Sequence, residues 1–274
     1  MDKNAILPET GLTRLRRRLC SRPMTAATAP ENPIVIIPAR MASTRLPGKP
    51  LAEIAGEPMI VHVWRRAVTA DVGPVIVACG EIEIIDAIKA AGGDAVFTSA
   101  DHPSGSDRIF EALSTADPGK RHDCVINLQG DLPDIDPASI RAVLTPLSDP
   151  AVDISTLVAK ITDPAERADA STPKVALSMA EGASSGRALY FSRTAIPSGD
   201  GPLYHHIGIY GYRREALERF VGLPQGVLER RESLEQLRAL ENGMRIDAQL
   251  VDTVPLGVDT PADLERARLA AAPA

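Results

Sequence analysis

The feature that most constrains the fold is an alternation of short apolar runs with amphipathic helical patterns. The runs are almost continuously apolar, as is typical of strands buried on both faces of a parallel sheet. In the first half we expect strands at 34–38, 75–78, 95–98 and 124–128. We expect helices between them at 58–70, 82–91, 106–116 and 137–147. This order predicts an α/β fold with a doubly wound, mostly parallel sheet and helices on both faces.

The pattern changes after Pro150. Alternating runs separated by turn-rich segments predict a smaller antiparallel insertion, with strands at 154–161, 175–180 and 188–192. Helices are then expected at 215–221, 233–242 and 260–271, with a strand at 245–251. The chain therefore divides into an α/β domain at 32–150, an antiparallel part at 151–212 and a return to the first domain at 213–270.

Residues 1–31 differ in composition from the rest. Four arginines between positions 14 and 18 are followed by a small, polar, Pro-rich stretch. A signal peptide needs an apolar region after its basic residues, and this segment has none. We expect a disordered extension, and hypothesise that translation naturally starts at Met24. Mass spectrometry of the native N-terminus tests this hypothesis, which a chain beginning at Met1 contradicts.

Charge and cysteine usage exclude several classes of protein. A net charge of -6 argues against a general nucleic-acid binder. Cys20, Cys79 and Cys124 are far apart, which argues against a zinc cluster or a disulfide framework and for a reducing, cytoplasmic location. No apolar run approaches the roughly 20 residues of a membrane-spanning helix, so we expect no membrane association.

A basic loop follows the first expected strand and contains Arg40, Arg45 and Lys49. Three cations within ten residues suit a polyanion, such as a triphosphate. A solvated basic loop is the alternative. The loop has no GxGxxG motif, and its Gly48-Lys49 pair lacks the upstream glycine and the following Ser/Thr of a P-loop. Side-chain cations and loop amides must therefore hold any phosphates.

Two acidic residues are candidate metal ligands. Asp131 follows a buried strand through Gln129 and Gly130, and Asp259 precedes the last helix. Each has a simpler interpretation, because Asp131 lies in a turn-like sequence and either Asp259 or Thr260 could cap the helix. If the two acids faced each other, they could hold one or two Mg²⁺ ions against a triphosphate.

Two further motifs are candidates for ligand binding. The segment 99–108 has small hydroxyl residues beside Gly105, which can bring main-chain groups to a base edge; alternatively it is a loop ending at a helix capped by Ser106. In the segment 205–213, His206 and Tyr210 should share one face of a strand and could bind a polyhydroxylated acid. A strand with one buried aromatic face is the alternative.

Taken together, the motifs resemble a known family. In order, they are IIPARMASTRLPGKPL, ADHPSGSDR, NLQGDLP, LYFSRTAIP, HHIGIYGYR, SLEQLR and GVDTPADLERAR. Between about residues 33 and 268 the chain resembles the 3-deoxy-manno-octulosonate (KDO) cytidylyltransferases. The first motif is shared more loosely with other sugar nucleotidyltransferases, whereas the HHIGIYGYR and SLEQLR motifs are much more specific to this family.

The resemblance implies a homodimer with a nucleotide-binding α/β domain, of the nucleotide-diphospho-sugar transferase type, and a smaller dimerisation part. It implies transfer of CMP from CTP to KDO, with release of pyrophosphate, for lipopolysaccharide synthesis. The implied CTP-binding residues are Arg40, Arg45, Lys49, Ser104, Gly105, Ser106 and Gln129. The implied KDO-binding residues are Arg193, His206, Tyr210, Glu235 and Gln236. Asp131 and Asp259 are the implied Mg²⁺ ligands, and with Lys49 the catalytic residues.

One departure from the family pattern lies beside a proposed metal ligand. Leu132 stands where the family commonly has glutamate, which could alter metal affinity or substrate choice. Two alternatives follow: a cytidylyltransferase for a related acid, such as 8-amino-KDO or a sialate-like sugar, or an inactive CTP-binding regulator.

Overall fold

The computed structural model describes residues 29–272. The proposed start at Met24 and nearly all of the predicted N-terminal extension lie outside these residues. Glu31, the last residue of that predicted extension, donates its backbone N–H to the carboxylate of Asp123 at 2.8 Å. No helix among the described residues is both long and apolar enough to span a bilayer.

The expected strands are present with small shifts of their ends. The strands are β1 (Pro33–Ala39), β2 (Glu53–Ile54), β3 (Glu57–Pro58), β4 (Val75–Cys79), β5 (Asp94–Phe97), β6 (Cys124–Asn127), β7 (Ile154–Lys160), β8 (Lys174–Ser178), β9 (Ser185–Ser192), β10 (Tyr204–Arg213) and β11 (Ile246–Val251). Strands β2 and β3 form a separate small hairpin.

The helices are mostly where the periodicity predicts them. They are α1 (Met59–Ala70), α2 (Ile82–Ala90), α3 (Gly105–Ala116), α4 (Pro137–Ala142), α5 (Pro164–Ala168), α6 (Arg214–Val221), α7 (Val227–Glu232), α8 (Leu237–Glu241) and α9 (Pro261–Ala271), with 3-10 turns η1 (Lys49–Leu51) and η2 (Thr145–Ser148). Pro58 is the N-cap of α1 rather than its first residue.

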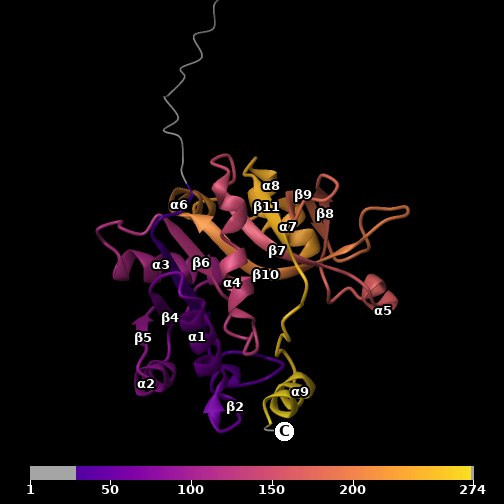
Figure 1. Ribbon diagram of the computed structural model, residues 1–274. Helices are drawn as coiled ribbons and strands as arrows, with labels where there is room; N and C mark the ends of the chain where they lie inside the picture. Colours follow the sequence, from indigo (N-terminus) through magenta and orange to yellow (C-terminus); the bar gives the residue numbers. More distant parts are fainter. Residues whose placement is uncertain (1–28, 273–274) are drawn as a thin grey trace, which may run out of the picture.

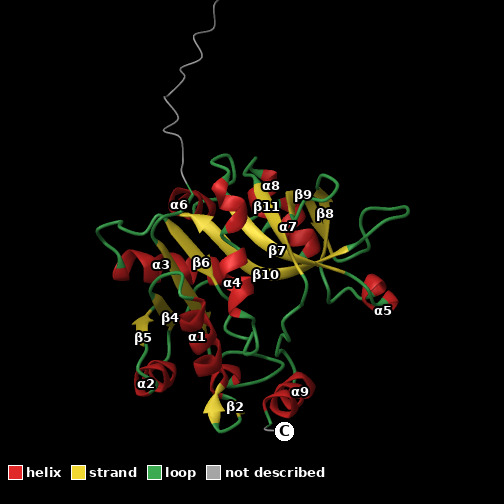
Figure 2. Ribbon diagram, in the orientation of Figure 1, coloured by secondary structure: helices red, strands yellow, loops and turns green. Residues whose placement is uncertain are grey.

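One large sheet of nine strands crosses the molecule in the order β5-β4-β1-β6-β10-β7-β11-β9-β8 (Figure 2). Strands β5, β4, β1 and β6 are parallel, whereas β10 runs antiparallel to both β6 and β7. Strand β11 is parallel to β7, and β9 and β8 continue antiparallel. The α/β class is confirmed, but the prediction of a mostly parallel sheet is right only for the first half.

The strands of the predicted insertion belong to this same sheet. The first residues of β10 pair with β7 on one side and with β8 on the other. Strands β10, β7, β11, β9 and β8 therefore close on one another into a ring. Closure leaves fewer exposed strand edges in this half of the molecule.

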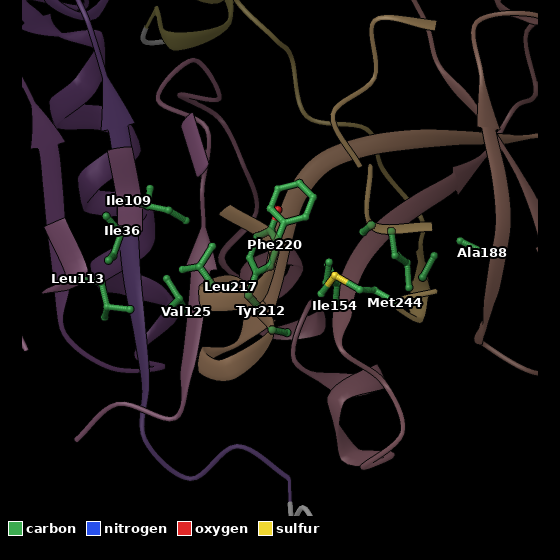
Figure 3. Close-up of a cluster of buried hydrophobic side chains, with 14 of the residues drawn as sticks. Ile36, Ile109, Leu113, Val125, Ile154, Ala188, Tyr212, Leu217, Phe220 and Met244 are labelled. Atoms are coloured by element: carbon green, nitrogen blue, oxygen red, sulfur yellow. The ribbon is translucent and has the colours of Figure 1, made fainter. Parts of the chain in front are cut away.

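The core has two parts, one on each face of the sheet. Ile34 and Ile36 of β1 pack with residues of α3 and α6, and Figure 3 shows Ile36 with Ile109, Leu113 and Phe220. The intervening Val35 belongs to the second cluster, with residues of α1, α2 and α4. Alternate side chains of one strand thus meet helices on opposite faces, as a doubly wound fold requires.

The last helix packs against residues from the first third of the chain. Helix α9 lies beside the β2–β3 hairpin (Figure 1), where Leu264 and Ala267 pack with Ile54 and Met59. This contact places the residues just before α9 next to the loop that follows β1.

Two predicted helices are wrong in detail. The helix expected at 233–242 is present only as α8 (Leu237–Glu241), because Ser233 is the left-handed C-cap of the preceding helix α7, with φ of 54°. Leu234 and Leu237 are buried in the core, and this tertiary packing overrides the helical periodicity. The helix expected at 137–147 likewise ends early and continues as η2 after Leu144.

Candidate active site

Two acids and two cations from distant parts of the sequence form what we call the four-charge cluster: Arg45, Lys49, Asp131 and Asp259. The Lys49 ammonium donates to Asp131 Oδ2 at 2.7 Å and to Asp259 Oδ1 at 2.9 Å. A terminal nitrogen of Arg45 lies 3.0 Å from Asp259 Oδ2. The structure therefore brings Asp131 and Asp259 together, as the metal-site hypothesis requires.

Local structure explains how Asp259 reaches this cluster. Thr260 caps α9, its hydroxyl accepting from the backbone N–H of Asp263 while Asp263 accepts from the backbone N–H of Thr260 at 2.8 Å. Asp263 also accepts from the N–H of Asp259 at 3.1 Å. The N–H of Val258 donates to the carbonyl of Asp131 at 3.0 Å. Because Thr260 is the cap, the carboxylate of Asp259 is available to the cluster.

The four charges balance one another. Burial alone would lower the pKa of Lys49, but the neighbouring carboxylates of Asp131 and Asp259 outweigh it and raise this pKa above its ordinary value. The lysine is therefore charged at physiological pH. Its side chain is only 15% exposed, whereas that of Asp259 is 46% exposed and accessible to a ligand.

A cavity of about 670 Å³ opens beside the cluster, at the carboxyl ends of β1 and β6, where open α/β sheets bind ligands. Its lining residues come from the loops after these strands and from the segment before α9: Pro38, Ala39, Arg40, Ala42, Ser43, Thr44, Arg45, Lys49, Pro50, Gln129, Gly130, Asp131 and Asp259. Gly130 approaches the backbone closely, since an added Cβ would lie 2.9 Å from the carbonyl oxygen of Pro38. The predicted basic loop is therefore one wall of a cavity.

A second, smaller pocket of about 160 Å³ adjoins the first. We call it the small pocket; it is lined by Pro38, Ala39, Arg40, His102, Pro103, Ser104, Gly105, Arg108 and Gln129. Four of these residues also line the larger cavity. The two hollows can therefore hold two parts of one ligand.

The start of α3 differs from the prediction. Ser104, not Ser106, caps the helix, accepting from the backbone N–H of Asp107. Ser106 is buried and is absent from the lining of the small pocket. Its hydroxyl instead donates to Glu235 Oε2 at 3.2 Å. Ser106 thus links the first turn of α3 to the segment that carries Glu235 and Gln236.

His206 and Tyr210 lie together on β10, as the sequence predicts. Their ring centroids are 5.5 Å apart, although the register of β10 against β7 shifts between Ile207 and Tyr210. Burial lowers the pKa of His206 to about 3, so its imidazole is neutral. Nε2 of His206 lies 3.1 Å from the hydroxyl of Thr156.

Arg193 contacts the main chain of the segment just before Glu235 and Gln236. The Arg193 guanidinium donates to the carbonyls of Glu232 at 2.8 Å, Ser233 at 3.2 Å and Ala170 at 3.1 Å. Glu235 Oε1 and Gln236 Nε2 are buried without a hydrogen-bond partner among residues 29–272. Burial raises the pKa of Glu235. Buried polar atoms without partners are a common feature of ligand sites.

The residues of the four-charge cluster fit a hard divalent cation that is shared with a ligand. Both carboxylates already contact one cation, the ammonium of Lys49. No group of three or more His, Cys, Asp or Glu side chains among residues 29–272 could hold a metal by itself. Two carboxylates completed by phosphate oxygens and water are a usual Mg²⁺ arrangement.

The sequence analysis missed two residues of this region. Glu81 accepts from the backbone N–H groups of Met41 at 2.9 Å and Gly80 at 3.1 Å, and so holds the start of the basic loop. Its position just after β4 was the available signal. His102, in the small pocket, was not singled out either. Leu132 is buried in the core with Ile135.

Comparisons with known proteins agree with this geometry. Residues 34–246 match the family model described as Cytidylyltransferase. A "3-deoxy-manno-octulosonate cytidylyltransferase" of Paramagnetospirillum magneticum is 64% identical over 236 residues, which cover 86% of this chain and 96% of the relative. A protein of the same description from Rhodospirillum centenum is 61% identical over 245 residues, covering 89% and 95%.

A solved structure is also similar. It is described as CMP:2-keto-3-deoxy-manno-octonic acid synthetase complexed with CTP, and it superimposes with a TM-score of 0.80 at 41% sequence identity. The match covers 88% of this chain and 98% of that one. A nucleotidyl transferase from Methanothermobacter thermautotroptrophicus, at 15% identity and a TM-score of 0.58, shares the fold.

Proposed function

Because this chain belongs to the family of 3-deoxy-manno-octulosonate cytidylyltransferases, we infer that it transfers CMP from CTP to KDO and releases pyrophosphate. The structural observation that carries this inference is the convergence of Asp131 and Asp259 on Lys49 at the edge of a cavity. The product, CMP-KDO, would serve lipopolysaccharide synthesis.

We propose that CTP spans the two adjoining hollows. Arg40, Arg45 and Lys49 bind the triphosphate in the larger cavity, with Gln129 in the wall common to both. The cytosine lies in the small pocket near Ser104 and Gly105. Because Ser106 is turned toward Glu235, its role is to connect the two substrate regions rather than to touch the base.

We propose that Asp131 and Asp259 hold Mg²⁺. In the four-charge cluster these carboxylates form ion pairs with Lys49 and Arg45. A divalent cation at the carboxylates would leave both basic side chains available for phosphate oxygens. When bound, the ion supplies charge stabilisation at the α-phosphate and orients the reacting oxygens.

The proposed reaction is an in-line displacement at the α-phosphorus. The anomeric hydroxyl of KDO gives up its proton to solvent and its oxygen forms a bond to this phosphorus, while the bond to the oxygen bridging the α- and β-phosphates breaks. Lys49, Arg45 and Arg40 neutralise the departing pyrophosphate. No covalent intermediate is needed, so catalysis rests on positioning and electrostatics.

For KDO we propose the site formed by Arg193, His206, Tyr210, Glu235 and Gln236. The neutral imidazole of His206 suits a hydroxyl rather than a carboxylate. Glu235 and Gln236 carry buried polar atoms that a polyhydroxylated sugar could satisfy. Arg193 is the proposed partner of the KDO carboxylate, and its guanidinium also donates to three main-chain carbonyls.

A pyrophosphate-release assay with each nucleoside triphosphate and KDO tests this function directly. Release with CTP and KDO alone is the expected result. Faster release with 8-amino-KDO or a sialate-like acid would favour the alternative substrate. CTP binding without any release would favour an inactive regulator. That alternative is motivated by Leu132, but this side chain is buried in the core, and its burial does not support the alternative.

We further propose a cytoplasmic homodimer. Cys79 and Cys124 are free and buried, which is consistent with a reducing compartment. Leu189 lies on β9, in the ring formed by β10, β7, β11, β9 and β8, and is 57% exposed. A second copy of the chain could cover this apolar position. Light scattering on the purified protein tests the dimer, and a monomeric mass at micromolar concentration contradicts it.

A further inference from the structure

A histidine and a glutamate at the small pocket have no part in the roles proposed so far. Nε2 of His102 is hydrogen-bonded to Glu111 Oε2, and the same oxygen accepts from the backbone N–H of Ser99 at 3.0 Å. His102 lines the small pocket and Glu111 does not. The imidazole therefore stands between the carboxylate and the pocket, in an orientation that the carboxylate fixes.

This arrangement determines which nitrogen of His102 carries a proton. Hydrogen bonds from His102 and from the N–H of Ser99 lower the pKa of Glu111, so its carboxylate is ionised and can only accept. Nε2 must then be the nitrogen that donates to Glu111, and the tautomer that donates from Nε2 carries its lone pair on Nδ1. Nδ1 has no hydrogen-bond partner among residues 29–272.

The small pocket also offers donors. Arg108 is 4% exposed and lines the pocket, with one terminal nitrogen donating to the hydroxyl of Thr98 at 2.7 Å. The pocket thus combines an imidazole acceptor with a guanidinium. Cytosine carries an amino donor at C4 and a carbonyl acceptor at C2, whereas uracil carries a carbonyl at C4. An acceptor matched to the C4 substituent distinguishes these two bases.

We propose that His102, oriented by Glu111, accepts a hydrogen bond from the exocyclic amino group of cytosine and thereby selects CTP over UTP. In this role His102 determines specificity and Glu111 is a positioning residue. The proposal rests on the proposed function for one point, which is that the cytosine of CTP lies in the small pocket.

The test is the ratio of kcat/KM for CTP to that for UTP, measured by pyrophosphate release with KDO, together with the ratio of the two Kd values. Both ratios are independent of the amount of active protein. His102→Phe keeps a ring but removes the acceptor, and should lower each ratio about tenfold, as expected for one hydrogen bond. Glu111→Ala lets the ring change tautomer and should lower the ratios by a smaller factor.

A matched control exists in the same chain. Glu166 contacts Nδ1 of His205 as Glu111 contacts His102, but it lies outside the small pocket. Glu166→Ala should leave both ratios unchanged. A folded His102→Phe protein that retains the CTP preference overturns the proposal, as does a wild type that binds CTP and UTP equally. If the wild type prefers CTP in binding but releases no pyrophosphate, the proposed function fails and the Kd ratios still decide the role of His102.

Discussion

The four-charge cluster and the buried pair of Asp117 and Arg214 are both ion pairs between carboxylates and basic side chains, but they differ in exposure. Asp117 is 1% exposed and accepts from the Arg214 guanidinium at 2.6 Å and from the backbone N–H groups of Arg121 and His122. Asp259, by contrast, is nearly half exposed, and among residues 29–272 its carboxylate contacts only the cations Arg45 and Lys49. One carboxylate is saturated inside the protein, and the other can still bind a ligand.

The difference shows how to tell a structural ion pair from a functional one. A buried charge must find all its partners within the protein, and removing one of them is costly. A charge at the edge of a cavity keeps part of its bonding capacity for the ligand. The two regions should therefore respond in opposite ways to substitution, one through stability and the other through turnover.

The largest effect is expected at the buried pair. Asp117→Asn removes the nearer and more buried of the two counter-charges of Arg214, leaving Glu218 at 3.5 Å, and sets an amide N–H₂ against backbone N–H donors. We expect a loss of about 4 kcal/mol in the free energy of unfolding. Urea denaturation measures this loss. The fraction that remains folded should release pyrophosphate at the normal rate, and a stability within 1 kcal/mol of wild type, on the order of a surface substitution, would contradict the comparison.

At the four-charge cluster, Asp259→Ala should act on rate instead. Removing one contact that stabilises developing charge costs on the order of 3 kcal/mol, a hundredfold or more in kcat. The fold should persist, because the half-exposed side chain contributes little to the core. Pyrophosphate release and a thermal melt of the same sample measure the two effects, and near-normal release would refute the metal assignment.

A pH change should sharpen the contrast by a smaller amount. Burial would raise the pKa of Asp117, but the N–H groups of His122 and Arg121 and the charge of Arg214 lower it below its ordinary value of 3.8. On acidification the unfolded chain binds the proton first. The stability that Asp117 provides is thus complete above about pH 4 and is lost as the pH falls further.

The corresponding measurement compares wild type with Asp117→Asn at several pH values. Their difference in unfolding free energy should be constant near neutrality and shrink below about pH 4, by at most about 1.4 kcal/mol per pH unit for one proton. A difference that grows on acidification would mean that another group dominates.

The same comparison explains what the sequence could predict. Lys49 and Asp131 follow neighbouring strands of a parallel sheet, so local patterns already placed them at one edge. Asp259 could be assigned only conditionally, because its position depends on where α9 packs, and α9 packs against Ile54 and Met59, about 200 residues earlier in the chain. Long-range packing of this kind leaves no local pattern.

Tertiary contacts also decided the details that were predicted wrongly. Ser106 has a suitable sequence for a helix cap, but the cap is Ser104 and Ser106 contacts Glu235. Ser233 has the sequence of a helix start, yet it ends α7. The antiparallel half of the sheet follows from the pairing of β10 with both β6 and β7, which strand patterns alone do not specify.

The smallest effect is expected at Thr260, where one substitution should lower both the stability and kcat. Its hydroxyl caps α9, and replacement by alanine should cost about 1 kcal/mol of stability. Asp263, the other half of the capping box, also accepts from the N–H of Asp259, so loss of the cap should loosen the carboxylate that we propose as a Mg²⁺ ligand. Thr260→Ala should therefore lower kcat several-fold, whereas Thr260→Ser should restore both values. A variant that loses stability with unchanged kcat would show that Asp259 is positioned by Lys49 and Arg45 rather than by the helix cap.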